Sequence, residues 1–338
     1  MRRWEETDGT AGAGEAVARV MYASRAAIEG SVYAEMEDIR ASALRHNAPV
    51  GVATALLHQS GWFVQWKEGP GQEVLRIMER VARDPRHRDL RVVHRSRGPR
   101  LLQGPWSMAI VQCQETRHDM ERRVLHLKSQ VDAGMAFTPP AVWRRLSTPM
   151  QHPGAVRQQD PDAFQRVLAC SASGDLAFGL VAALGQLHGE EVVHRRFAGE
   201  RDLDVGTDYV DFEQGGRVWR VIAMARNGLH LPLTRAFLPD YSHLVLQLSG
   251  RDEADARLLQ RVASACAGLP LQPRLLGVAR EPASQARALA LARRAGLTYV
   301  AVAADPRDPV ASWQAVRRVL APQAVNEDGL PTRPAALQ

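Results

Sequence analysis

Two styles of alternation between strand-like and helical segments run along this chain, and they constrain its fold more than any other feature. The first style predicts a strand over 17–24, a helix over 31–45 capped by Ser31, and a hairpin over 50–68. The next predicted elements are a helix over 72–83, strands over 90–95 and 106–113, and a charged helix over 114–130. The order β-α-β-β-α-β-β predicts a ferredoxin-like sandwich, with helices on one face of a mixed sheet.

The second style begins at residue 164, where strand-like apolar runs alternate with longer helical ones. The predicted strands are 166–172, 192–197, 219–225, 244–249, 275–279 and 298–304, and the predicted helices are 176–187, 254–268, 284–296 and 310–320. This alternation is typical of an open, mostly parallel α/β sheet. The whole chain is therefore expected to be an α/β protein.

A length of 338 residues is enough for two domains, each with its own core. We expect a first domain over 15–128, a linker over 129–163, a second domain over 164–320 and a tail over 321–338. The linker is inferred from its prolines, and the tail from its lack of periodicity. The Gly-rich residues before the first domain are expected to be frayed.

Composition excludes several classes of protein. Hydrophobic residues make up 45% of the chain, yet no apolar run approaches the roughly 18 residues of a membrane span. The start of the chain lacks the apolar stretch of a secretory signal, so we expect a cytoplasmic protein. Cys113, Cys170 and Cys266 are far apart, which predicts free thiols and no metal site. The net charge of +6 comes from interspersed arginines, which disfavours nucleic acid as a partner.

Polar side chains are expected to gather beside a slot between the first two helices. Ile39 and Val81 face inward from these helices, and the two aliphatic groups can sandwich a flat aromatic ring. The polar residues expected near the same place are Tyr22, His46, Asn47, Gln65, Arg86 and His87. Amides of Asn and Gln offer a donor and an acceptor together, which matches the edge of a pyrimidine-like ring. Each residue taken singly also has an ordinary interpretation, as core, helix cap or surface.

The order and spacing of six short motifs carry a specific resemblance. The motifs are Tyr22-Ala23-Ser24-Arg25-Ala26, Arg45-His46-Asn47, Ala53-Thr54-Ala55-Leu56-Leu57, the run from Gly61 to Gly69, Asp84-Pro85-Arg86-His87 and Trp106-Ser107-Met108. Together, over residues 17–113, they resemble the successive motifs of BLUF domains, a family of flavin-binding blue-light sensors. The sequence departs from the family pattern at Val52-Ala53-Thr54, at Leu102 and at Lys67, where the family has leucine before Glu-Gly.

The resemblance implies that FAD binds noncovalently between the two helices. Tyr22 would then donate an electron and a proton to the excited flavin, and the amide of Gln65 would rearrange between them. The residues implied to contact the cofactor are Ser24, Ile39, His46, Asn47, Gln65, Val81, Arg86 and His87. Trp106 and Met108 would compete for the position beside Gln65 and relay the signal. The protein is thus expected to be a blue-light photoreceptor.

The second domain weakly resembles small GTPases, with residues 170–177 where a phosphate loop would lie. A phosphate loop needs a lysine, and this half of the chain has none. Asp175 would also repel phosphate. We therefore expect no enzyme here, but a degenerate domain that transmits the signal to an unknown downstream protein.

Two alternatives remain open at this point. The chain can be a flavin-free interaction scaffold that kept the BLUF fold, or a light-regulated nucleotide-binding protein. The sequence is also compatible with a homo-oligomer.

Overall fold

The computed structural model describes residues 16–112, 115–148, 152–154, 164–172, 175–198, 206–269 and 272–320. Cys113, the predicted frayed start and the predicted tail lie outside these ranges. The chain divides into two compact units. The first unit holds the chain up to residue 151 and takes back 194–206 and 227–240, and the second unit holds the rest.

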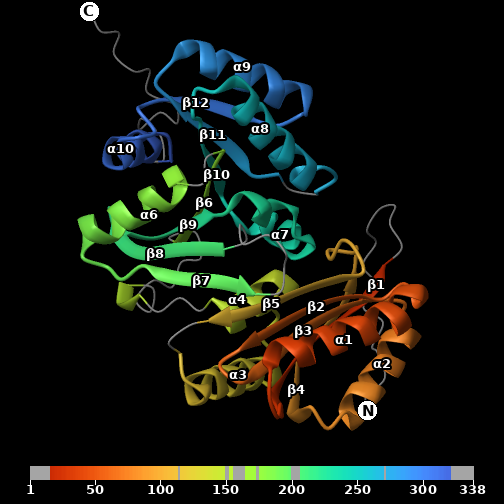
Figure 1. The fold of residues 1–338 in the computed structure, drawn as a ribbon. Helices are drawn as coiled ribbons and strands as arrows, with labels where there is room; N and C mark the ends of the chain where they lie inside the picture. Colours follow the sequence, from red (N-terminus) through yellow and green to blue (C-terminus); the bar gives the residue numbers. More distant parts are fainter. Residues whose placement is uncertain are drawn as a thin grey trace, which may run out of the picture. The chain divides into compact units, whose positions relative to one another are not determined.

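A mixed sheet forms the centre of the first unit, in the order β7-β5-β2-β3-β1-β4. Its strands are β1 (Val17–Ala26), β2 (Ala53–Gln59), β3 (Trp62–Gly69), β4 (His87–Gly98), β5 (Trp106–Gln112) and β7 (Val193–Ala198). β2 and β5 run parallel, and the other neighbours run antiparallel. Helices α1 (Val32–His46) and α2 (Gly71–Arg83) follow β1 and β3 in the chain (Figure 1). The predicted β-α-β-β-α-β-β order is confirmed.

Local sequence explains where these elements begin and turn. The side chain of Ser31 accepts a hydrogen bond from the backbone N–H of Ala34, as the predicted cap requires. Between β2 and β3, Ser60 and Gly61 have φ angles of 49° and 73°. Positive φ at both central residues is the geometry of tight hairpin turns that match the twist of the strands.

The side chains of the first unit's sheet divide between two apolar faces, as strand periodicity requires. On one face, β1, β2, β3 and β5 pack against α1 and α2. On the other face, Met21, Val64 and Trp66 pack against α3 (Arg117–Asp132), α4 (Pro139–Ser147) and α7 (Pro232–Phe237). The first face is the one on which the predicted site residues lie.

Three segments of the first unit differ from the expected organisation. Helix α4 lies within the predicted linker, where its apolar residues Val142, Trp143 and Leu146 are buried. Strand β7 and helix α7 come from the part of the sequence assigned to the second domain, but they pack in the first unit. Proline content alone suggested a linker at 129–163, although Pro139 and Pro140 stand in the first turn of a helix, where proline is tolerated.

An open, mostly parallel sheet forms the second unit, in the order β12-β11-β10-β6-β9-β8. Its strands are β6 (Phe164–Ser171), β8 (Gly206–Gln214), β9 (Arg217–Met224), β10 (His243–Gln247), β11 (Arg274–Ala279) and β12 (Tyr299–Ala303). β8 pairs antiparallel with β9, and every other pairing is parallel. This architecture is the one that the sequence predicted.

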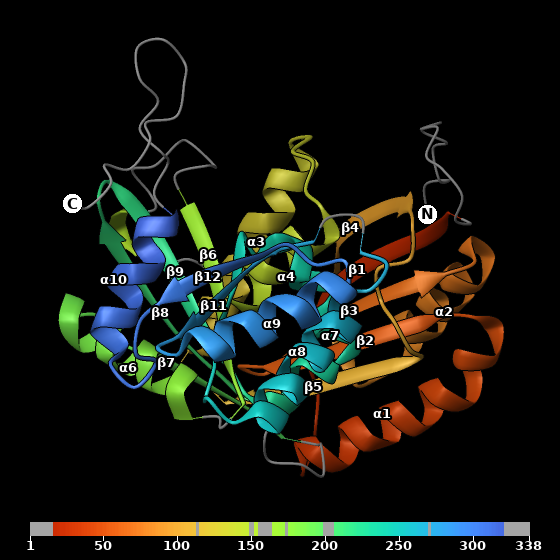
Figure 2. The same ribbon diagram turned by 90° about the horizontal axis from the view of Figure 1, so that it is seen from above.

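Helices cover both faces of the parallel strands in the second unit (Figures 1 and 2). α6 (Asp175–His188) and α10 (Pro309–Leu320) bury apolar side chains against one face, and α8 (Asp252–Cys266) and α9 (Pro282–Arg294) lie on the other. Cys170 and Cys266 are buried free thiols. None of the helices in the described ranges is long and apolar enough to cross a membrane.

Candidate functional site

A continuous row of residues crosses the sheet of the first unit on the face covered by α1 and α2. Tyr22 of β1 lies opposite Gln65 of β3, and Gln65 lies opposite Leu56 of β2. Leu56 in turn lies opposite Met108 of β5. All four side chains are buried. Strand register therefore brings together four positions that are up to 86 residues apart in the sequence.

Two separate apolar clusters flank this row. Under α1, Ile39 packs with Met36, Phe63 and Met108. Under α2, the half-buried Val81 packs with a cluster that includes Tyr22 and Ile77. The predicted pair of aliphatic side chains thus lies in two different clusters, one under each helix.

A pocket opens where α1 and the end of α2 approach one another. Its volume is about 590 Å³, and its lining consists of Glu35, Arg80, Arg83, Asp84, Pro85 and Arg86. Arg86 donates hydrogen bonds to the carboxylate of Asp84 at 2.6 to 3.1 Å. It also lies 3.7 Å from the carboxylate of Glu35 on α1. Of the predicted cofactor contacts, only Arg86 lines this pocket, and its charged residues can hold a charged or polar part of a ligand.

Four buried polar atoms on the same sheet face have no hydrogen-bond partner. They are Tyr22 Oη, Thr54 Oγ1, Gln65 Oε1 and Trp106 Nε1. A buried polar group without a partner costs roughly 1–3 kcal/mol, so a polar ligand at this face would stabilise the domain by pairing with these atoms. Donors and acceptors are both present, as the edge of a flavin ring requires. The residues present therefore fit a flavin.

His87 lies against the tyrosine and keeps its ring neutral. Its Nδ1 is 2.7 Å from Ser24 Oγ, and its ring centroid is 5.9 Å from that of Tyr22 and 5.0 Å from that of Phe63. Burial lowers the pKa of His87 to about 4. Burial and the negative charge of Asp84 raise the pKa of Tyr22 well above its ordinary value. The phenol therefore keeps its proton at neutral pH.

The two residues at the end of α1 have different surroundings. Asn47 is buried as the C-cap of α1, and its Oδ1 accepts a hydrogen bond of 3.4 Å from Arg80. His46 is exposed, and its Nδ1 is bonded to the backbone carbonyl of Ser42 at 2.8 Å. Asn47 thus lies buried between α1 and α2, whereas the ring of His46 is exposed to solvent and bonded within its own helix.

Sequence reasoning omitted three residues that the structure places on the slot face. Phe63 and Lys67 stand two residues before and after Gln65 on β3, so strand alternation alone would have found them. Arg80 lies one position before Val81 on α2 and reaches Asn47. Its role depends on a contact between distant segments, which no local pattern indicates.

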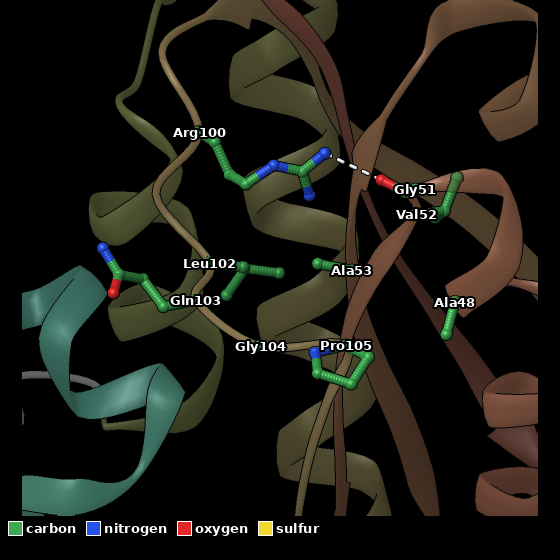
Figure 3. A pocket seen from close by; sticks show the side chains of 9 residues that line it. All are labelled: Ala48, Gly51, Val52, Ala53, Arg100, Leu102, Gln103, Gly104 and Pro105. Carbon is green, nitrogen blue, oxygen red and sulfur yellow. Dashed lines mark hydrogen bonds between the residues drawn. The ribbon is translucent and has the colours of Figure 1, made fainter.

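A different pocket of about 490 Å³ lies where β2 and β5 begin (Figure 3). Arg100 crosses this region and donates hydrogen bonds to the carbonyls of Gly51 at 2.7 Å and Glu68 at 3.1 Å. Leu102 and Ala53 point toward one another between the loop and β2. None of the predicted site residues lines this pocket. Through these two hydrogen bonds, Arg100 fixes the loop before β5 to Gly51 and Glu68.

The fold and the site define an α/β domain with buried polar residues on the sheet face that α1 and α2 cover. Residues 17–109 match the family model described as BLUF, sensors of blue-light using FAD. The N-terminal domain of this chain is a BLUF domain, and so a flavin-binding blue-light sensor domain.

Curated relatives are similar to this domain over a short stretch. The photoactivated adenylate cyclase subunit beta of Euglena gracilis is 40% identical over 60 residues, which cover 18% of this chain and 7% of the relative. A beta-like protein FB of the same organism is also 40% identical, with the same coverage. The chain thus matches only a small part of each of these relatives.

Solved structures with BLUF folds are also similar. The dark-state structure of the BLUF protein BlrB has 23% identity and a TM-score of 0.26, and covers 38% of this chain and 91% of that one. BlsA in its photo-activated state has 21% identity and a TM-score of 0.29, and covers 40% of this chain and 96% of that one.

Proposed function

We propose that this protein is a blue-light photoreceptor that binds FAD noncovalently in the slot between α1 and α2. The observation that carries the proposal is the buried pair Tyr22 and Gln65, opposed across β1 and β3, each with an unpartnered polar atom. When bound, FAD would supply the absorption of blue light and an excited state that accepts an electron. The protein residues would supply the electron, the proton and the response.

Tyr22 would act as the donor. Its phenol keeps its proton in the dark, because burial and Asp84 raise its pKa. Loss of an electron to the excited flavin makes a phenol strongly acidic, so Tyr22 would release its proton to the neighbouring amide of Gln65, and the amide would release one of its own protons toward the ring. Gln65 would then exchange donor for acceptor at its amide end without a large movement. Changing one buried hydrogen bond in this way costs roughly 1–3 kcal/mol, which is enough to bias two conformations.

The response would cross the sheet through β3. Trp66 follows Gln65 and projects from the opposite face, where its Nε1 donates to Glu68 at 3.1 Å. Its ring centroid lies 6.2 Å from that of Trp143 on α4 and 6.4 Å from that of Phe237 on α7. Helix α7 is joined by the chain to β9 and β10 of the second unit. We therefore assign α7 as the covalent route by which the sensor acts on that unit.

A second route would run through β5. Met108 lies opposite Leu56, which lies opposite Gln65. Trp106 lies two residues before Met108 and has an unpartnered Nε1. An amide rearrangement at Gln65 would change the hydrogen-bond partner available to the side chains of this strand. Trp106 and Met108 are thus proposed as relay residues.

The second unit would act as a non-enzymatic interaction module. One pocket of about 350 Å³ lies at the carboxyl ends of its parallel strands, where open α/β sheets bind ligands. Its lining consists of Asp175, Leu176, Ser249, Arg251, Pro306 and Arg307. This pocket favours nucleotide binding as a second candidate function. Against it, Asp175 lies in the lining, and this half of the chain has no lysine.

Two measurements on the full chain test these assignments. After reconstitution with equal amounts of FAD and FMN, mass spectrometry of the released flavin is expected to find FAD. Calorimetry with ATP and GTP is expected to show no binding, and binding of either would favour the second candidate. A chain that takes up no flavin would support the scaffold alternative.

Hydrogen exchange in dark and light tests the route through α7. We expect the exchange of amides in 227–240 to change on illumination and to stop responding in Phe237→Ala. A matched control is Phe178→Ala, which removes an aromatic ring from the core of the second unit. An identical light response of 227–240 in wild type and Phe237→Ala would contradict the route.

A further inference from the structure

A buried lysine stands on the slot face of the sheet beside the proposed photochemical pair. Lys67 lies on β3, two residues after Gln65, so the two side chains share one face. It lies opposite Val20 of β1 and Thr54 of β2. Only 2% of its surface is exposed. The ammonium group is thus held under the slot rather than in solvent.

No carboxylate of the described residues forms an ion pair with Lys67. Arg80 of α2 is the charged group that acts on it, and together with burial it lowers the pKa of Lys67 to about 7. Lys67 in turn helps to lower the pKa of His87 at the start of β4. The other charged groups at the nearby pocket are Glu35, Arg83, Asp84 and Arg86, and Arg86 pairs with both carboxylates. A buried cation without a partner is costly, so this position favours either the neutral amine or an ammonium group with an acceptor from outside the chain.

Lysine is rare in this chain, which makes the choice of lysine at position 67 informative. Lys67 and Lys128 are the only lysines in the sequence, and the other cationic residues are arginines. An arginine would stay charged in any environment, whereas a buried lysine can lose and regain its proton.

We propose that Lys67 contacts the flavin ring and supplies a positive charge under its polar edge, which raises the affinity of the bound flavin for electrons. This inference rests on the proposed function. By linkage, negative charge on the ring must favour the protonated form of Lys67 to the same extent. Lys67 would thus tune how readily Tyr22 gives up its electron to the ring.

Nuclear magnetic resonance of the lysine side chains provides the first test. With ¹³C-labelled lysine the full chain gives signals from two lysine side chains, and loss of one in Lys67→Met assigns it. We expect Lys67 to titrate at higher pH with reduced flavin bound than with oxidised flavin bound, by about one pH unit or more. Lys128, which pairs with Asp132 on α3, is the internal control and should not move. An unchanged titration of Lys67 between the two flavin states would overturn the inference.

Redox titration of the bound flavin provides the second test. At a fixed potential, the ratio of reduced to oxidised flavin should fall about tenfold in Lys67→Met. Lys67→Arg should retain most of the wild-type ratio, and Lys128→Met should match the wild type. Loss of flavin from Lys67→Met but not from Lys67→Arg would also support a required charge. Equal ratios in wild type and Lys67→Met would contradict the inference, whereas failure of every form to bind flavin would contradict the proposed function itself.

Discussion

Tyr22 and Gln65 face one another across β1 and β3, and each leaves a buried polar atom without a hydrogen-bond partner. Each of these two atoms can form a hydrogen bond, but the described protein supplies no partner for it. A ligand edge between α1 and α2 would satisfy both. The pair therefore links the fold of the domain to the proposed photochemistry.

Replacing Tyr22 by phenylalanine removes the proposed donor with little change of volume. We expect Tyr22→Phe to fold and to bind flavin, because the ring still packs with Ile77 and Val81. The light-induced change of the flavin spectrum should be lost. Absorption spectroscopy before and after blue light checks this, and a shift equal to that of the wild type would refute the role of the phenol.

Gln65→Leu tests the amide separately from the tyrosine. Leucine keeps the volume of the side chain but has no donor or acceptor to exchange. We expect retained flavin, an altered dark spectrum and no light-induced shift. Gln59→Leu is a control on β2, since its side chain bonds to Glu115 away from the slot. A normal photocycle in Gln65→Leu would argue against rearrangement of the amide.

Glu68 fixes the loop before β5 onto β3. Its Oε2 accepts hydrogen bonds from the backbone N–H groups of Leu101 and Leu102 at 2.7 and 2.8 Å, and its Oε1 accepts one from Trp66. Glu68→Ala leaves these donors unpaired and should destabilise the protein by about 2–4 kcal/mol. Glu79→Ala, at an exposed position of α2, should change stability by less than about 0.5 kcal/mol. Urea unfolding compares the two, and equal midpoints would contradict this role of Glu68.

Lys67 predicts how the stability of the flavin-free protein depends on pH. Its pKa is lowered on folding, from 10.5 to about 7. Between these values the unfolded chain holds a proton that the folded chain lacks, so stability rises with pH by about 1.4 kcal/mol per unit. Below pH 7 both the folded and the unfolded chain hold the proton, so Lys67 no longer makes stability depend on pH. Lys67→Met should therefore stabilise the flavin-free protein at pH 7 and lessen its gain between pH 7 and 9, as measured by urea unfolding. A variant with the same pH dependence as the wild type would show that Lys67 is not buried as described.

The sequence predicted the elements well because most of them follow a local pattern. The hairpin at Ser60-Gly61 and the cap at Ser31 depend on neighbouring residues, and the structure has both. The positions of β7 and α7 depend instead on contacts between residues far apart in the chain. No local periodicity reports which sheet a strand joins.

The site was predictable to a similar degree. Motif order drew attention to Tyr22 and Gln65, and strand register explains why these two side chains lie on one face. His46 follows the same motif, yet it ends α1 on the exposed side, because adjacent helical residues point in different directions. The charge of Lys67 was visible in the sequence, but its burial and its lack of a carboxylate partner were not.

The absorption spectrum of the full chain after reconstitution with FAD decides whether this protein senses blue light. We expect a yellow protein whose flavin band moves to longer wavelength under blue light and returns in the dark. A colourless protein, or a bound flavin whose band does not respond to blue light, would contradict it.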